Sequence, residues 1–208
     1  MIVELTTLLA FVPAGVALNL TPGADMMFCL AQGMKGGARP AAYASAGVSA
    51  GAMVNVTLAG LGVGALIAAH PPVFEAIRWA GVLYLLILAY RTLRSPLAAS
   101  DVAPVRSSRA FRDGMLVNIS NPKVILFILA FLPQFIDPSR GSVLAQFLVL
   151  GSVFATTGFL VNAAVGYFAG GIGRVLARSK GAAKGLSFAS AAIFCLLALR
   201  LVLEKRPA

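Results

Sequence analysis

The chain has 208 residues, of which 59% are hydrophobic and 12% are charged, and its mean hydropathy is +0.89. Soluble domains have about twice this charged fraction, so the composition excludes an ordinary soluble protein. The net charge of +10 would suit a nucleic-acid-binding protein, but the basic residues cluster in short loops between apolar segments, which is typical of membrane topology. We therefore expect an integral membrane protein with no nucleic-acid partner.

Six apolar segments are predicted along the chain, each near or above the ~20 residues that a helix needs to cross hydrocarbon. They cover residues 5–31, 41–69, 73–90, 114–131, 142–172 and 186–203. The longest polar stretch lies between the third and fourth segments and contains two prolines, which is typical of a connector. We therefore divide the chain into a first three-helix repeat (1–94), a cytoplasmic linker (95–112) and a second three-helix repeat (113–208).

Polar motifs that contain proline interrupt the first and fourth segments. They read Asn19-Leu20-Thr21-Pro22-Gly23-Ala24-Asp25 and Asn118-Ile119-Ser120-Asn121-Pro122-Lys123. Proline lacks a backbone donor and clashes with the preceding turn, so each motif predicts a broken helix. A break at membrane depth is tolerated only where protein or water covers the freed backbone groups. Matching breaks in two halves of a chain indicate a transporter binding site near the bilayer midplane.

The two halves share one order of elements, namely a broken segment, a long Gly-rich segment and a short Leu-rich segment. Pro22 aligns with Pro122, and Gly51 aligns with Gly151. Because each half holds three segments, the second half enters the membrane from the opposite side. The sequence thus predicts an all-α polytopic membrane protein, with six transmembrane helices in two inverted three-helix repeats whose first helices are broken.

The distribution of basic residues predicts the orientation. The loops after the first, third and fifth segments hold most of them: Lys35, Arg39, Arg91, Arg94, Arg106, Arg109, Arg112, Arg174, Arg178, Lys180 and Lys184. Positive loops stay cytoplasmic, so both termini are predicted to lie outside, on the periplasmic side of a bacterial inner membrane. The basic tail, with Arg200, Lys205 and Arg206, is the one feature that opposes this orientation.

Asp25 and Lys123 are the two charges most clearly placed at membrane depth, each after a helix-breaking proline. Ionisable groups there are costly and therefore mark functional sites. We expect Asp25 to carry protons and Lys123 to be its charge partner; the alternative is that one or both lie near the interface. The sequence has no metal-ligand spacing, nucleotide-binding loop or hydrolase motif, so we expect no enzyme, cofactor or metal, and uphill transport would draw on an ion gradient.

The polar residues of the breaks are the candidate ligands of a small substrate. A half-helix that starts after a proline presents N–H groups to a carboxylate, and carbonyls before the break suit an ammonium group, so an amino acid matches both ends. The same side chains can instead replace lost backbone hydrogen bonds. The predicted substrate-binding residues are Asn19, Thr21, Pro22, Gly23, Asn118, Asn121 and Pro122. The sequence leaves open whether Asn55, Asn162 and Gln134 line the pathway, because hydrogen bonding between helices explains them equally well.

These residues resemble the LysE/RhtB family of amino-acid exporters. Further motifs follow in the family's order: Gly33-Met34-Lys35-Gly36-Gly37-Ala38-Arg39, Trp79-Ala80-Gly81-Val82-Leu83-Tyr84-Leu85, Phe111-Arg112-Asp113-Gly114 and Phe131-Leu132-Pro133-Gln134-Phe135. The resemblance implies a six-helix inner-membrane exporter of the threonine, homoserine and homoserine lactone efflux type, driven by the proton-motive force. The family commonly has Pro-Gly-Pro in the first break, where this chain has Pro22-Gly23-Ala24. The substrate therefore stays open.

Three other functions compete with proton-coupled export. The first is an uncoupled facilitator or channel of the same fold. The second, a thiol-relay enzyme, would need paired cysteines, whereas Cys29 and Cys195 lie far apart in apolar segments, where we expect small buried side chains. The third, a membrane subunit without a transport role, leaves the matching breaks unexplained. The sequence does not decide the coupling stoichiometry or whether the protein is a homo-oligomer.

Overall fold

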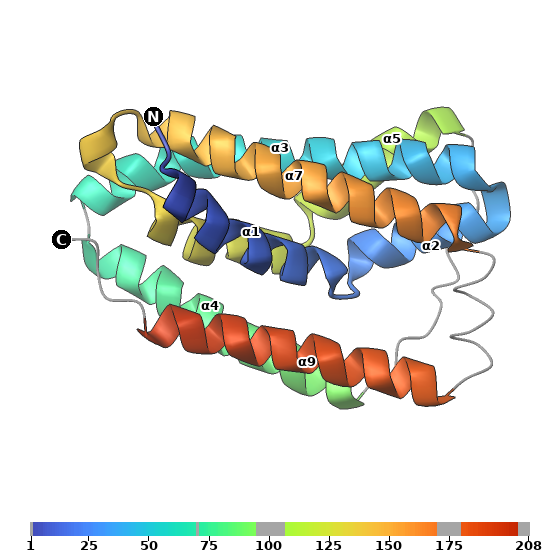
Figure 1. Ribbon diagram of the computed structural model, residues 1–208. Coiled ribbons are helices and arrows are strands. Elements are labelled where there is room, and N and C mark those ends of the chain that lie inside the picture. Colours follow the sequence, from blue (N-terminus) through green and yellow to red (C-terminus); the bar gives the residue numbers. More distant parts are fainter. Residues whose placement is uncertain (1, 70, 95–106, 170–179, 204–208) are drawn as a thin grey trace.

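The computed structural model describes residues 2–69, 71–94, 107–169 and 180–203, and nearly all of them are helical. The elements are α1 (Leu5–Leu20), α2 (Ala24–Gly36), α3 (Ala38–Ala69), α4 (Pro71–Arg94), α5 (Ser107–Ile119), α6 (Pro122–Leu126), the π-helix η1 (Phe127–Phe131), the 3-10 helices η2 (Leu132–Phe135) and η3 (Pro138–Arg140), α7 (Val143–Tyr167) and α9 (Lys180–Leu203). Within the described ranges there is no β-strand. The predicted all-α polytopic class is confirmed (Figure 1).

The described helices include four that are long and apolar enough to cross a membrane without a break, and they lie in α3, α4, α7 and α9. Two further helix pairs are bent at the predicted motifs, by 54° between α1 and α2 and by 52° between α5 and the segment Pro122–Phe135. If each bent pair counts as one span, the total is the six that the sequence predicts. Proline thus ends a helix at both predicted positions.

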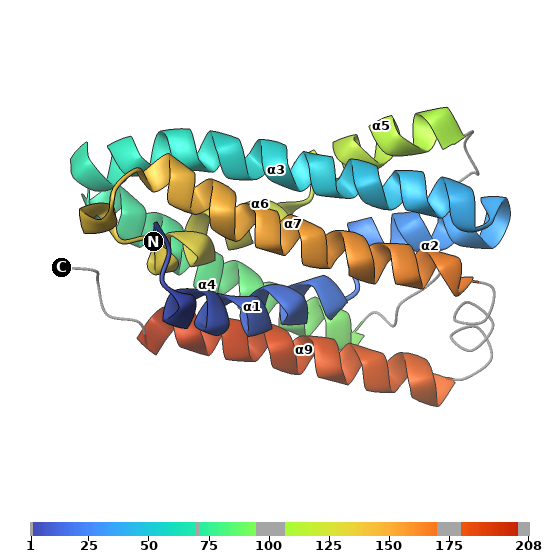
Figure 2. The same ribbon diagram turned by 45° about the horizontal axis from the view of Figure 1, so that its top comes forward.

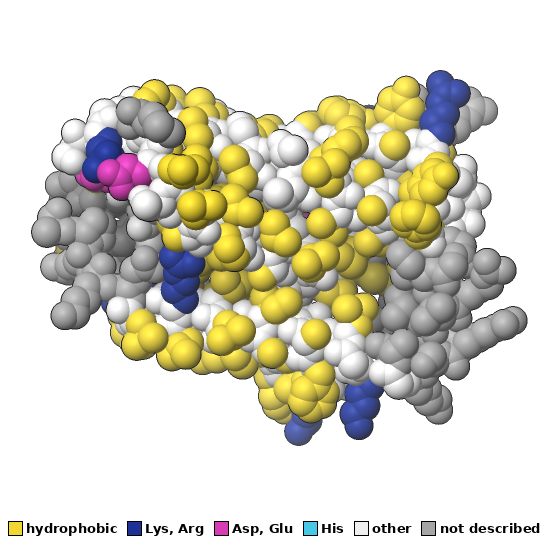
Figure 3. Space-filling model, viewed as in Figure 1, with side chains coloured by type: hydrophobic (Ala, Val, Ile, Leu, Met, Phe, Trp, Pro, Cys, Tyr) yellow, Lys and Arg dark blue, Asp and Glu magenta, His cyan; other side chains and the backbone are white. Residues whose placement is uncertain are grey.

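The outer surface of the bundle suits contact with lipid. Large apolar side chains point outward from several helices, for example Leu9, Leu58, Leu83, Leu160 and Leu196, which are all exposed. Figure 3 shows a face on which hydrophobic and uncharged atoms predominate and charged side chains are few. A surface of this kind is unfavourable in water and favourable in hydrocarbon.

The helix boundaries differ from the predicted ones mainly where the fourth segment begins. The prediction starts this segment at residue 114, whereas α5 starts at Ser107, so the last part of the predicted linker 95–112 is helical. Residues 95–106 lie outside the described ranges, as do the residues beyond 169 in the predicted segment 142–172. The division of the chain into two repeats at this linker stays a prediction.

Helices from the two halves pack against each other and run in opposite directions. α3 and α7 lie side by side and antiparallel, and α4 and α9 form a second antiparallel pair (Figures 1 and 2). α1 and α2 contact α7, while α5 contacts α3, so each broken helix lies against the long helix of the other half. The start of α1 and the end of α9 lie at the same end of the bundle. This arrangement is the one expected of an inverted repeat.

Glycines allow the backbones of α3 and α5 to touch. A Cβ atom on Gly47 would lie 1.9 Å from the carbonyl oxygen of Phe111, and one on Gly114 would lie 2.4 Å from that of Ala44. Small residues at such crossings let membrane helices approach closely, where dispersion and weak polar contacts stabilise the pair. The position of the second break against α3 therefore depends on these two glycines.

We expect Gly47→Ala to destabilise the protein by about 1–3 kcal/mol, because the added methyl group forces the two helices apart. The matched control is Gly62→Ala on the same helix, where a Cβ would meet no atom within 4 Å. This second change should be neutral or stabilising, by up to about 1 kcal/mol, because alanine favours a helix. Thermal unfolding of the detergent-solubilised protein, followed by circular dichroism, measures both. Equal stability of the two variants would contradict the proposed close packing.

Candidate functional site

The ammonium group of Lys123 holds the first break together. Its Nζ donates to the carbonyl oxygens of Thr21, at 2.9 Å, and Leu18, at 3.3 Å. The last carbonyls of a helix lack intrahelical donors, and a positive charge is favoured beside them. The side chain of Thr21 adds a bond of 2.8 Å from its Oγ1 to the carbonyl of Ala17. A lysine from the second break therefore satisfies the backbone of the first.

Gly23 makes room for this lysine. A Cβ atom on Gly23 would lie 3.0 Å from Nζ and 3.2 Å from Cε of Lys123. Gly23 precedes α2 and forms no side-chain cap, and the neighbouring Pro22 is buried. The Pro22-Gly23 pair of the motif thus has two separate roles, since the proline ends α1 and the glycine admits the ammonium group.

At the second break, asparagine side chains form hydrogen bonds with the freed backbone groups. Oδ1 of Asn121 accepts a hydrogen bond of 3.0 Å from the backbone N–H of Lys123, and Pro122 occupies the start of α6, where its missing donor costs nothing. Asn55 of α3 donates to the carbonyl of Asn118 at 3.4 Å. The side chain of Asn121 therefore takes the place at the start of α6 that the sequence suggests for a carboxylate.

Asp25 and Lys123 meet in the interior, although their side chains form no direct ion pair. The Lys123 ammonium group contacts the two carbonyls of the first break instead, although the two charges interact through space. Asp25 receives a hydrogen bond of 3.0 Å from Nδ2 of Asn118 to its Oδ2. Asp25 is 6% exposed and Lys123 is 8% exposed, so both side chains are buried within the protein.

A small buried cavity lies beside Asp25. Its volume is about 10 Å³, which is about the space that one water molecule needs. Its polar lining comes from both breaks and from both long helices: Asn19, Asp25, Ser49, Asn118 and Asn162. An amino acid enters this cavity only if the surrounding helices move apart.

Three residues that line this cavity each have an acceptor oxygen that lacks a hydrogen-bond donor within the described part of the chain. These oxygens are Oδ1 of Asp25, Oδ1 of Asn118 and Oδ1 of Asn162. Buried polar atoms without partners are rare in proteins, and each needs an explanation. The structure thus brings Asn162, which the sequence left open, to the same place as two predicted site residues.

The other predicted ligands lie around the cavity in structural roles. Thr21, Pro22, Gly23, Asn121 and Pro122 form the two breaks and do not line it. Asn19 lines it, and its Nδ2 donates to the carbonyl of Phe154, at 3.1 Å, and to Oγ1 of Thr157, at 3.0 Å.

Two serines of α3 form hydrogen bonds with backbone carbonyls of α7. Ser49 lines the cavity, and its hydroxyl donates to the carbonyl of Ala155 at 3.0 Å; Ser45 donates to that of Phe159 at 2.8 Å. The sequence analysis missed both serines, because nothing in their local pattern separates them from packing residues. A helical wheel of α3 would have shown the two serines, which are four residues apart, on one face of the helix.

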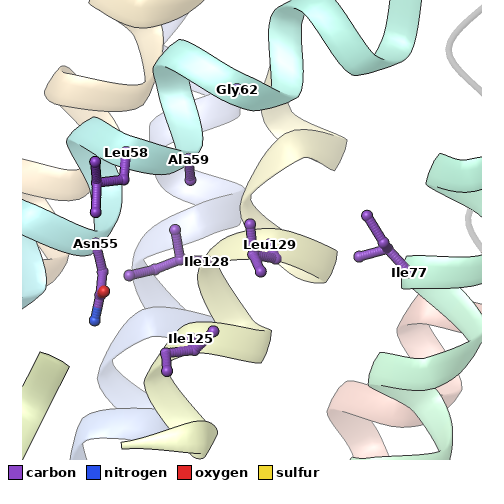
Figure 4. Close-up of a pocket in the computed structure, with 8 residues that line it drawn as sticks. All are labelled: Asn55, Leu58, Ala59, Gly62, Ile77, Ile125, Ile128 and Leu129. Carbon is purple, nitrogen blue, oxygen red and sulfur yellow. The ribbon is translucent and has the colours of Figure 1, made fainter. Parts of the chain in front are cut away.

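A larger pocket lies between α3, α4 and the segment that contains α6 and η1 (Figure 4). Its volume is about 370 Å³. Apart from Asn55 its lining is apolar: Leu58, Ala59, Gly62, Ile77, Ile125, Ile128 and Leu129. Such a pocket suits an aliphatic group of a substrate and a lipid chain equally well, so its shape alone assigns no ligand.

The remaining candidates lie away from the cavity. Nε2 of Gln134 donates to the carbonyl of Ala130 at 2.8 Å, within its own helical segment. Cys29 is buried, as expected, but Cys195 is exposed on α9, so the prediction of two buried cysteines was wrong for the second. In the described ranges no group of three His, Cys, Asp or Glu residues could hold a metal ion.

Comparison with known proteins gives consistent matches. A family model described as LysE type translocator matches residues 16–205. An uncharacterized membrane protein of Vibrio cholerae is 34% identical over 171 residues, which are 81% of this chain and 83% of that protein. A homoserine/homoserine lactone efflux protein of Salmonella typhi is 34% identical, over 68% of this chain and 70% of its own. A leucine efflux protein of Enterobacter is 32% identical, over 72% of this chain and 73% of that protein. No solved structure gives a significant match.

We expect Lys123→Met to destabilise the protein by about 1–3 kcal/mol, because the Thr21 carbonyl loses its donor, the Leu18 carbonyl keeps only the bond from the N–H of Thr21, and Asp25 loses its charge partner. Lys184→Met is the matched control, since Lys184 is exposed on α9 and its loss should change stability by less than about 0.5 kcal/mol. Thermal unfolding in detergent measures both changes. If the two variants unfold at the same temperature, Lys123 does not hold the first break.

Proposed function

The chain belongs to the family of LysE type translocators, and from this we propose that it exports an amino acid or a small amino-acid derivative across the bacterial inner membrane in exchange for protons. One observation carries the proposal. The carboxylate of Asp25 at the first break and the side chain of Asn118 at the second break line one buried cavity inside a membrane-spanning bundle. Ionisable groups at membrane depth are costly, and they mark transport pathways and proton relays.

The named relatives support an amino-acid substrate. Leucine, homoserine and homoserine lactone, which appear in their names, differ in side chain, and the lactone has no free carboxylate. The α-amino group is the feature that all three compounds share. We propose that this chain recognises the same group. The substrate site that we propose lies at the two breaks. Asn19 and Asn118 line its cavity, and the other predicted residues shape the breaks around it: Thr21, Pro22, Gly23, Asn121 and Pro122.

Asp25 is the proposed proton carrier. Its side chain is a carboxyl group at the cavity, and Oδ1 has no hydrogen-bond donor among the described residues. Lys123 is fixed on two carbonyls, and we propose that it keeps its charge while Asp25 changes its own. An uncoupled facilitator of the same fold would need no such titrating group.

The distribution of charge supports termini on the outer side. At the end of the bundle where α1 starts, Arg140 pairs with Glu4 and Asp137, and Arg78 pairs with Glu75. Hydrogen bonds from Ser139 lower the pKa of Asp137, so this carboxylate stays charged at neutral pH. The opposite end bears several exposed basic residues, namely Lys35, Arg39, Arg91, Arg94, Arg109, Arg112 and Lys184. Its excess of positive charge is typical of a cytoplasmic face.

Cysteine labelling tests this orientation. In a variant whose Cys29 and Cys195 are replaced by alanine, we expect Ser139→Cys to react with a membrane-impermeant maleimide in intact cells. Arg39→Cys should react only after the membrane is permeabilised, which also serves as the control for accessibility. Efficient labelling of Arg39→Cys in intact cells would reverse the proposed topology.

We expect Asp25→Asn to abolish uphill export, because an amide cannot exchange a proton. The protein should still reach the membrane, and counterflow, which needs no net proton movement, should remain measurable at saturating substrate. Uphill export and counterflow are measured in the same vesicles, with the amount of inserted protein as the control. Undiminished uphill export would rule out Asp25 as the carrier and favour the uncoupled facilitator.

A further inference from the structure

The position that the sequence suggested for a substrate ammonium group is filled by the protein itself. Nζ of Lys123 contacts the carbonyls of Leu18 and Thr21, which precede the first break. A second cation at these carbonyls would be repelled by the lysine. If the substrate has an amino group, that group therefore needs acceptors elsewhere.

We infer that Asp25, Asn118 and Asn162 form the binding site for the ammonium group of the substrate. The inference rests on the proposed export of amino acids and makes Asn162 of α7 a ligand. The three side chains are 6%, 2% and 4% exposed, and all three line the same cavity. They come from α2, α5 and α7, so both halves of the chain contribute to the site.

The hydrogen-bonding capacity of these groups matches an ammonium group. Such a group has three N–H donors and no acceptor, and the cavity offers three Oδ1 oxygens without donors. The amide of Asn118 is oriented by its bond from Nδ2 to Asp25, so its Oδ1 is the atom left to accept. The side chain of Asn121 is a further neighbour of the Asp25 carboxylate and does not line the cavity.

Charge and size agree with this assignment. Lys123 is the one charged side chain that acts on Asp25 among the described residues, and its ammonium group is committed to backbone carbonyls. The cavity of about 10 Å³ admits one small polar group, and an ammonium group is about as large as a water molecule. The rest of the substrate would lie outside it, between helices that separate during transport.

This site would couple the substrate to protons by competition. An ionised Asp25 accepts hydrogen bonds from the ammonium group, whereas a protonated Asp25 has lost its charge and carries a donor of its own. Substrate and proton therefore exclude each other at one carboxyl group. Exchange across the membrane then needs no second ion site.

The experiment compares an amine with its hydroxyl analogue. Purified protein in liposomes takes up labelled L-leucine or L-homoserine by counterflow, and unlabelled leucine or 2-hydroxy-4-methylpentanoate competes. The two competitors differ only at the α-position, where the hydroxy acid has a neutral hydroxyl group. For the wild type, we expect leucine to compete at a concentration at least about tenfold lower, since hydrogen bonds to charged groups are the stronger ones.

Asn162→Leu should reduce this discrimination to about threefold or less, because one acceptor is lost. Asn162→Asp keeps an acceptor oxygen and should retain the full discrimination, which separates a lost contact from a misfolded protein. Gln134→Leu is the matched control, since Gln134 donates to the carbonyl of Ala130 in its own helical segment and lies outside the cavity. It should leave the ratio unchanged even if both affinities fall.

Two results would overturn the inference while leaving the proposed function intact. One is equal competition by leucine and the hydroxy acid in the wild type, and the other is unchanged discrimination in Asn162→Leu. If the wild type shows no counterflow of either amino acid, the proposed function itself fails, and the ammonium site fails with it.

Discussion

The structure depends on one constraint, which is that a helix broken inside a membrane must find partners for its freed backbone groups within the protein. At the first break the partner is the ammonium group of Lys123, and at the second it is a pair of asparagine side chains, Asn121 and Asn55. Lys123 itself belongs to the second break. Each half of the chain therefore supplies a group that the other half needs, and neither break is complete alone.

The same constraint explains why each broken helix packs against the long helix of the opposite half. Asn19 reaches two groups of α7, and Asn55 of α3 reaches the second break. Glycines at the crossing of α3 and α5 bring the backbones close enough for such short side chains to bridge them. The hydrogen bonds therefore depend on the close packing of the helices, because short side chains on a more distant helix could not reach the freed backbone groups.

The sequence predicted those features that local chemistry determines. Apolar length set the helices, and proline within a polar motif set both breaks, whereas Pro13 lies inside α1 without ending it. The partner of Lys123 was not predictable in this way. Opposite charges suggested Asp25, yet backbone carbonyls, which have no signature in a sequence, are the groups that it contacts. The π-helix Phe127–Phe131 escaped prediction for a similar reason, because every residue in it is apolar and fits a regular helix equally well. Asn162 could be noted as polar, but only the packing of α7 showed that it lines the same cavity as Asp25.

If Asp25 carries the proton as we propose, the fixed lysine also determines the charge of each transport step. With Asp25 ionised, the Asp25 and Lys123 charges cancel, and a zwitterionic amino acid adds none, so the loaded site is neutral. With Asp25 protonated and no substrate bound, the site bears the single positive charge of Lys123. If the carrier returns in this form, each exported zwitterion is exchanged for one inward positive charge. A membrane potential that is negative inside then drives the cycle, with about 2.3 kcal/mol per charge for each 100 mV. A cationic derivative such as an amino lactone would instead leave with a charge of its own, and its export would be driven by the pH gradient alone. One immobile lysine next to one titrating carboxyl group is sufficient to produce this difference between substrates.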